Sequence, residues 1–132
     1  MTELAVQTAA LLDASVARLT AGGEVAVAFS GGVDSGLIAA LAARHTGRVT
    51  LYTAGTEDSP DVLAARELAP RMGLELKVLT LTDKDIVPLL EAEIAATGTS
   101  SPLVLAFEMP LFLVLRDCCE TAVIGGQGAD EI

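Results

Sequence analysis

The chain is poor in aromatic, cysteine, histidine and basic residues. Of 132 residues, three are Phe, one is Tyr, none is Trp and one is His, whereas 52% are hydrophobic. Eight basic against eighteen acidic residues give a formal net charge of −10. This charge argues against nucleic-acid binding, which needs a basic surface. The two cysteines, Cys118 and Cys119, are adjacent and cannot form a Cys-x-x-Cys motif. We expect them to be helix residues of a reduced, cytoplasmic protein.

The sequence also lacks the patterns of membrane and secreted proteins. No basic region followed by an apolar core opens the chain, so no signal peptide is predicted. The longest apolar stretch, residues 103–115, contains Glu108 and Pro110 and is shorter than the roughly 20 residues of a membrane span. We expect this stretch to form a buried core helix. The single histidine, His45, is predicted to lie at a helix C-terminus, where it has no ligand or base role.

The remaining pattern alternates between strands and helices without a hairpin signal, which is typical of βαβ units and a parallel sheet. We predict helices over residues 2–20, 35–46, 60–72, 85–96 and 109–120, and strands over 24–29, 48–54, 75–81 and 122–125. The expected fold is α/β, an open parallel sheet with strand order 3-2-1-4 and helices on both faces. The length predicts one domain over residues 1–132.

The most informative segment is the run Ser-Gly-Gly-Val-Asp-Ser at residues 30–35, directly after an apolar strand. A glycine turn between a strand and a helix exposes backbone N–H groups that can bind phosphate. An ordinary flexible strand–helix turn is the alternative interpretation. For a phosphate site, the backbone and hydroxyl groups would bind the phosphates and one carboxylate would hold Mg²⁺. These groups belong to Ser30, Gly31, Gly32, Ser35 and, for the ion, Asp34.

Glycine and acidic residues also follow the second and fourth predicted strands, at residues 55–61 and 125–131. Open α/β sheets bind ligands at the carboxyl ends of strands, where the strand order reverses. We therefore expect the loops after the first and fourth strands to face each other. Asp130 and Glu131 would then meet Asp34 and complete a Mg²⁺ site. The alternative for this segment is a glycine turn with an acidic helix start.

Together the three segments resemble one family. The patterns Ser-Gly-Gly-x-Asp-Ser, Gly-x-x-x-Ser-Pro-Asp and Gly-x-Gly-x-Asp-Glu occur in this order at 30–35, 55–61 and 126–131. They resemble the synthetase domain of asparagine synthetases, within the N-type ATP pyrophosphatase (PP-loop) family, over about residues 22–132. The resemblance implies an adenine nucleotide alpha hydrolase-like fold that uses ATP and Mg²⁺. It also implies formation of β-aspartyl-AMP and pyrophosphate, followed by amide formation with ammonia.

The resemblance assigns roles to particular residues. The nucleotide site would comprise Ser30, Gly31, Gly32, Asp34, Ser35, Gly55, Ser59, Asp61, Gly125 and Gly126. The metal would be held by Asp34 and Asp130, and the catalytic residues would be Gln127, Asp130 and Glu131. Expected partners are aspartate or a similar acceptor, ammonia, a separate glutaminase and a second copy of the chain.

The chain departs from the family pattern at four points. Gln127 stands where the family has a glutamate, and Ala106 where it has an arginine. The glutaminase domain and its N-terminal cysteine are missing, and Thr2 occupies that place. The family domain continues beyond the Asp-Glu pair, so we expect a chain that is truncated and catalytically incomplete. Two alternatives stay open: an adenylating enzyme for another acceptor, and a non-catalytic nucleotide-binding regulatory module.

Overall fold

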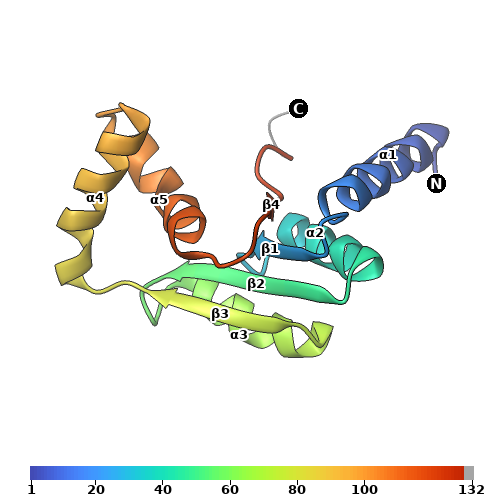
Figure 1. Cartoon of the computed structure of the whole chain (residues 1–132), viewed down its shortest axis with the longest axis horizontal. Coiled ribbons are helices and arrows are strands. Elements are labelled where there is room, and N and C mark those ends of the chain that lie inside the picture. The colour runs from blue at the N-terminus through green and yellow to red at the C-terminus, as the bar shows by residue number, and fades with distance from the viewer. Residues whose placement is uncertain (130–132) are drawn as a thin grey trace.

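The computed structural model describes residues 1–129. Helices and strands alternate along this part of the chain (Figure 1). The helices are α1 (Glu3–Leu19), α2 (Val33–His45), α3 (Pro60–Met72), α4 (Asp83–Thr97) and α5 (Pro102–Asp117). The strands are β1 (Glu24–Ala28), β2 (Arg48–Gly55), β3 (Glu75–Thr80) and β4 (Val123–Gly125). The strands form a parallel sheet in the order β3-β2-β1-β4, which confirms the predicted fold class and strand order.

Local sequence signals set the ends of several helices. Ser59 is the N-cap of α3 and Pro60 occupies its first helical turn, where proline costs no intrahelical hydrogen bond. The same helix ends at Gly73, whose φ of 68° is the left-handed conformation that glycine adopts readily. The Thr2 hydroxyl accepts a hydrogen bond from the Ala5 N–H at 3.3 Å and caps α1.

The strand pairing makes β1 the centre of the sheet. All five residues of β1 pair with β2, and residues 26–28 also pair with β4. Alternate side chains of β1 enter two separate cores. Val25 and Val27 pack in the core with α2 and α3, whereas Ala26 packs in the core with α4 and α5. Buried strands of a sheet covered on both faces show this arrangement.

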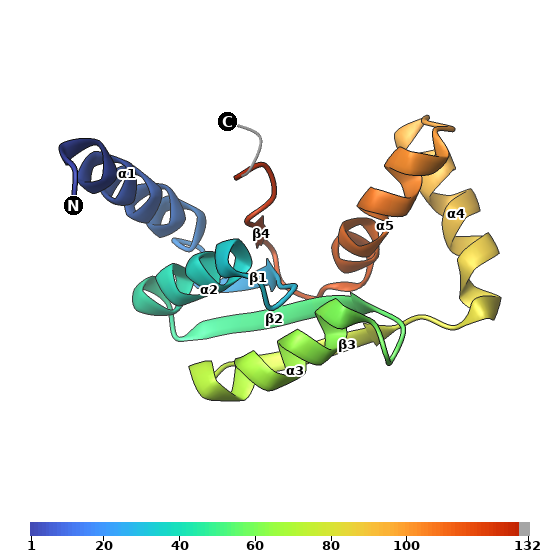
Figure 2. The same ribbon diagram turned by 180° about the vertical axis from the view of Figure 1, so that it is seen from behind.

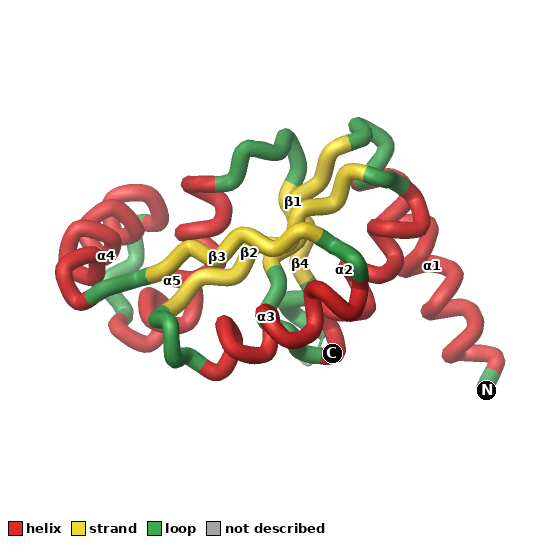
Figure 3. The backbone as a smooth tube through the Cα atoms, turned by 90° about the horizontal axis from the view of Figure 1, so that it is seen from below, coloured by secondary structure: helices red, strands yellow, loops and turns green. Residues whose placement is uncertain are grey.

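The helices therefore form layers on both faces of the sheet, as the sequence predicted. Figure 1 and the reverse view in Figure 2 show α3 on one side and α5 on the other. In Figure 3 the strands lie side by side, with α4 at one end of the molecule and α1 at the other. The segment after β4 rises between α5 and α1 (Figures 1 and 2).

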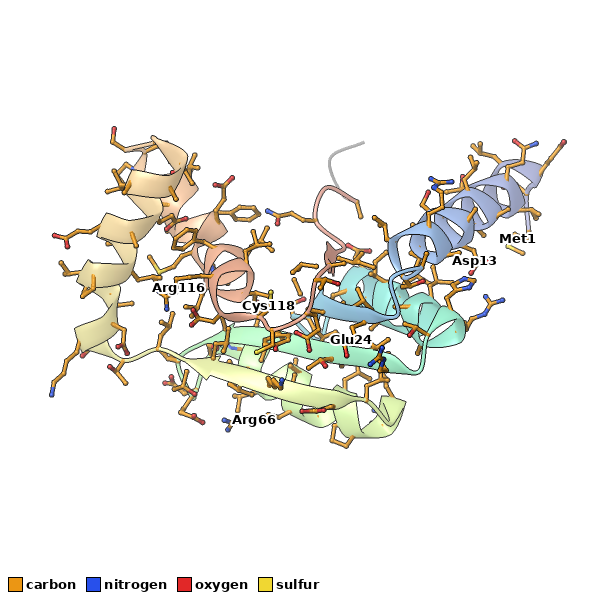
Figure 4. The ribbon with its side chains drawn as sticks, in the orientation of Figure 1. Met1, Asp13, Glu24, Arg66, Arg116 and Cys118 are labelled. Carbon is orange, nitrogen blue, oxygen red and sulfur yellow. The ribbon has the colours of Figure 1, made fainter. Side chains whose placement is uncertain are left out.

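The first helix projects from this body and touches it near its C-terminal end. Val16 is buried in the core, but the first ten residues of the chain are exposed. Asp13, labelled in Figure 4, lies 2.9 Å from His45 Nε2 and 3.5 Å from Arg44 at the end of α2. The predicted location of His45 at a helix C-terminus is confirmed.

The structure corrects three predictions on the second half of the chain. The last helix begins at Pro102 and ends at Asp117, so it starts seven residues before the predicted Met109 and stops three before Glu120. It begins early because Ser101 and Pro102 form a helix start and the helix accommodates Pro110 in its interior. Cys118 is the extended C-cap, so the two cysteines follow the helix instead of belonging to it.

The third correction concerns burial. The stretch 103–115 is only partly buried: Leu105, Met109, Leu113 and Val114 face the core, while Phe107 is 67% exposed. In α4, Leu89 and Glu93 are buried, Ile86 and Leu90 are partly buried against the same core, and Ile94 is exposed. Within residues 1–129, no single helix is long and apolar enough to cross a membrane. Only α4 and α5 together reach that length and composition, and they are bent by 97°.

Candidate functional site

A cleft of about 620 Å³ lies at the carboxyl ends of β1, β2 and β4. Its floor consists of the residues that follow these strands, and one wall is a face of α5. The cleft therefore occupies the place where open parallel sheets bind ligands, next to the strand at which the chain order reverses. The loop after β1 and the loop after β4 both contribute side chains or backbone to it.

The loop after β1 is held in shape by its own two serines. The Ser30 N–H and the Gly32 N–H donate to the hydroxyls of Ser35 and Ser30, each at 3.3 Å. The two hydroxyl oxygens are 3.2 Å apart, and the Ser35 hydroxyl also donates to the Gly32 carbonyl at 3.3 Å. Both serines line the cleft. The loop is thus a closed turn with two hydroxyls at the cleft floor.

Gly31 allows this turn to pass directly over α3. Its φ is +77°, and a Cβ added there would lie 2.7 Å from the Ala64 carbonyl carbon and 2.8 Å from the Ala65 nitrogen. Only glycine fits without a shift of the helix backbone. Gly31 and Gly32 shape the turn without lining the cleft themselves. Gly31 therefore allows a close backbone approach to α3, while the predicted contact of this turn with a phosphate stays a prediction.

The turn opens the N-terminus of α2 toward the cleft. The N-cap, Gly32, has no side chain to cap the helix. The first helical N–H with a backbone acceptor is that of Gly36, which donates to the Gly32 carbonyl. Within residues 1–129, the N–H groups of Val33, Asp34 and Ser35 have no acceptor. Free N–H groups at a helix N-terminus, together with the helix dipole, form a site for an anion.

The loop after β4 meets this helix end. Residues 125–129 line the cleft, and a Cβ added at Gly126 would stand 2.9 Å from the Asp34 carbonyl carbon. Gly128 has a φ of +90° in the turn that follows. The Asp34 side chain is exposed and lines the same cleft. The predicted meeting of the loops after the first and fourth strands is confirmed. Asp130 and Glu131, predicted to join Asp34, lie outside the described residues.

The segment 55–61 contributes less than the sequence predicted. Asp61, in the first turn of α3, lines the cleft. Gly55 and Ser59 do not line it; a Cβ at Gly55 would lie 2.6 Å from the Ser59 Oγ, so the two residues pack on each other. The Ser59 Oγ is buried and has no hydrogen-bond partner among the described residues. Their roles toward a nucleotide stay predictions.

The sequence analysis missed the apolar wall of the cleft. Five α5 residues form this wall, and they were expected in a buried core: Phe107, Pro110, Leu111, Val114 and Leu115. A signal for the wall was present, because the helix is apolar on more than the one face that a core requires. Tyr52 and Thr53 of β2 also line the cleft, near the carboxyl end of that strand.

Tyr52 links the cleft floor to a polar cluster beneath α5. Its hydroxyl accepts hydrogen bonds from Lys77 Nζ at 3.3 Å and from the Cys119 N–H at 3.4 Å. The Lys77 ammonium also stands 5.4 Å from the centre of the ring. Burial, together with the nearby Glu120, raises the pKa of Tyr52 above its ordinary value. The ring is therefore held by the backbone of β2 on one side and by the hydrogen bonds of its hydroxyl on the other, and it forms a rigid part of the cleft floor.

Comparison with known proteins agrees with this geometry. The family model described as asparagine synthase matches residues 7–132. The chain belongs to the asparagine synthase family. It is 32% identical over 131 residues to a putative glutamine-hydrolyzing asparagine synthetase of Methanocaldococcus jannaschii, covering 93% of this chain and 23% of that protein. It is 29% identical over 129 residues to the carboxyethyl-arginine beta-lactam-synthase of Streptomyces clavuligerus, covering 96% and 25%.

Solved structures include the same fold. The NH3-dependent NAD synthetase of Campylobacter jejuni superposes with a TM-score of 0.61 at 21% identity, over 91% of this chain and 55% of that one. The resemblance of the sequence motifs to the asparagine-synthetase branch of the PP-loop family is thus confirmed. The chain spans about a quarter of the length of the asparagine synthase relatives that it matches.

Proposed function

We propose that the cleft binds ATP and Mg²⁺ and activates a carboxylate as an acyl-adenylate, releasing pyrophosphate, before ammonia forms the amide. The observation that carries this proposal is the contact between the loop after β4 and the N-terminus of α2, at Gly126 and Asp34. It joins an anion site with free N–H groups to a carboxylate in one cleft. Membership in the asparagine synthase family supports the reaction class.

The groups in the cleft suit a nucleotide and its metal. The N–H groups at the start of α2 and the hydroxyls of Ser30 and Ser35 would hold the pyrophosphate portion. Asp34 and, by prediction, Asp130 would hold Mg²⁺. This hard ion prefers oxygen ligands and is often bound by protein carboxylates and substrate phosphates together. When bound, the ion neutralises charge on the leaving pyrophosphate. The backbone near Gly125 and Gly126 and the end of β2 would face the adenosine.

The part of the chain that the structure describes would act mainly by positioning. Holding the leaving phosphates and the acceptor in one orientation lowers the barrier without a covalent intermediate on the protein. Gln127 lies exposed in the loop after β4 and lines the cleft, so its amide would orient a reacting group but supply no charge. The amine would be free ammonia or ammonia from a separate glutaminase, which the name of the archaeal relative suggests.

Calorimetric titration with Mg²⁺-ATP and with metal-free AMP tests the proposal. Asp34→Ala should weaken binding of Mg²⁺-ATP about tenfold and leave AMP binding nearly unchanged, because its partner is the ion. Asp58→Ala is the matched control, since Asp58 is exposed and does not line the cleft. Wild-type protein that binds neither ligand would refute nucleotide binding. Equal losses for both ligands would refute the metal role of Asp34.

A further inference from the structure

We propose that the outer part of the cleft binds the acceptor, and that this acceptor is a carboxylic acid with an apolar body and no second carboxylate. The inference rests on the proposed function, because it names the substrate class of the same site. It is carried by the apolar wall on α5 and by the charges of the residues that line the cleft.

The wall extends over two levels of α5. Val114, near the end of the helix, packs with Ala26 and Tyr52 of the sheet. Phe107 lies two turns earlier, about 10 Å farther along the helix axis at 1.5 Å per residue. Figure 1 shows α5 descending from its junction with α4 toward the sheet, so the Phe107 level is the outer one. The cleft thus has an inner apolar level at the strand ends and an outer one beyond them.

The nucleotide has its own place at the inner level. The free N–H groups of α2, the serine hydroxyls and the glycine loop after β4 all lie at the strand ends. A nucleotide anchored there leaves the outer level for the second substrate. At that level Phe107 is 67% exposed, and it stands beside Leu111 in the lining of the cleft. An exposed aromatic ring on a cleft wall is typical of a surface that an apolar ligand covers.

The charges of the described lining residues favour an acceptor without a second carboxylate. Among the described residues that line the cleft, the charged side chains are Asp34 and Asp61, and no lysine, arginine or histidine is present. The carboxylate that is activated loses its charge in the reaction, since its oxygen bonds to the α-phosphorus of ATP as pyrophosphate leaves. A second carboxylate would find no cationic partner among the described side chains that line the cleft. Gln127, the polar side chain among residues 125–129 of the loop after β4, is neutral.

Calorimetry on the 132-residue chain tests the inference. The chain is first saturated with Mg²⁺ and an ATP analogue that has a methylene group between the α- and β-phosphorus atoms, so that no adenylate forms. It is then titrated with 3-phenylpropanoate or with aspartate. We expect the monocarboxylate to bind at least about tenfold more tightly than aspartate, because aspartate would leave a buried charged group without a partner.

Two variants of one residue sharpen the result. Phe107→Ala should weaken binding of 3-phenylpropanoate at least about fivefold and leave binding of the ATP analogue unchanged. Phe107→Lys should raise the affinity for aspartate, because it places a cation on the outer wall. Leu103→Ala is the matched control: Leu103 lies on the same helix, is 80% exposed and does not line the cleft.

The other outcomes show whether the proposed function or only the acceptor class is wrong. A chain that fails to bind the ATP analogue refutes the proposed function itself. Binding of the analogue with preference for aspartate, or with no binding of either acid, overturns only the acceptor class. An equal loss of analogue and acid binding in Phe107→Ala would assign the outer wall to the nucleotide and overturn the inference as well.

Discussion

A methyl group on Gly126 would stand 2.9 Å from the carbonyl carbon and 3.1 Å from the Cβ of Asp34. The two residues are 92 positions apart in the sequence (126 − 34), yet their backbones touch. The contact fixes how close the loop after β4 comes to the N-terminus of α2, and so it sets the width of the cleft at its floor. Glycine at this position is a requirement of packing, since the nearest atoms are mostly backbone.

Gly126→Ala should therefore widen the cleft. The added methyl must push the loop away from α2, so we expect about tenfold weaker binding of Mg²⁺-ATP and a loss of about 1–3 kcal/mol in the free energy of unfolding. Calorimetry and urea unfolding measure the two effects. Gly22→Ala is the control, because a Cβ there meets nothing within 4 Å. An affinity for ATP equal to that of Gly22→Ala would contradict the contact.

A second pair of glycine variants separates packing from backbone conformation. Gly31 and Gly73 have similar φ values, +77° and +68°, but only Gly31 would bring a Cβ against another helix. Gly73→Ala should cost about 1 kcal/mol for the left-handed conformation alone. Gly31→Ala should cost about 2–4 kcal/mol, because the clash with Ala64 is added. Equal shifts of the urea midpoint in the two variants would show that α3 yields to the methyl group.

The buried carboxyl of Glu93 should make stability depend on pH. It is 0% exposed, and neither of its oxygens has a hydrogen-bond partner among residues 1–129. Burial, reinforced by the charge of Glu108, raises the pKa of Glu93 above the ordinary value of 4.5. The folded state thus favours the protonated form, so its stability should fall as pH rises above 4.5 and level off once the raised folded pKa is passed.

Glu93→Gln tests this dependence, since glutamine has nearly the same shape and no charge. At pH 8 we expect the variant to be about 1–3 kcal/mol more stable than the wild type, because the neutral amide avoids the cost of a buried charge. At pH 4 the two proteins should have nearly equal stability. Glu91→Gln, an exposed change on the same helix, is the control. Wild-type stability that rises between pH 5 and pH 8, relative to the glutamine variant, would reverse the sign and refute the prediction.

Tyr52→Phe removes the hydroxyl that accepts hydrogen bonds from Lys77 and the Cys119 N–H. We expect a loss of about 1–2 kcal/mol in the free energy of unfolding, as two modest hydrogen bonds disappear while the ring keeps its packing. Urea unfolding measures the loss. Combining this change with Lys77→Met should give less than the sum of the single effects. Additive losses would mean that the lysine does not interact with the phenol.

The sheet and the facing loops could be predicted because they depend on local and directional signals. Alternating apolar strands and amphipathic helices determine parallel pairing, and a glycine run after a strand marks the carboxyl edge where loops collect. The run 30–35 and the segment 125–129 therefore lie where the sequence indicated. The roles of Asp130 and Glu131 stay predictions.

The second half of the chain was less predictable, because the polarity of its side chains does not indicate whether they are buried or exposed. The predicted helix began at Met109, but α5 begins at Pro102, with Ser101 as its N-cap, and continues through Pro110 in its interior. Glu93 is buried and Phe107 is exposed, the reverse of what side-chain polarity predicts. The cleft wall and the buried carboxyl both depend on how α4 and α5 meet, which periodicity alone does not specify.

The pairing of β4 has a consequence for the timing of local motions. β1 is held on both edges, but β4 is joined to it by three residue pairs, Ala26 with Val123, Val27 with Ile124 and Ala28 with Gly125. A short strand with so few pairs opens at a lower free energy than the centre of a sheet. Release of β4 would remove one side of the cleft while α2 and its open N-terminus stay in place. A ligand that touches both loops would then slow amide exchange at Ile124 far more than at Val27, which makes the strand an intrinsic reporter of occupancy.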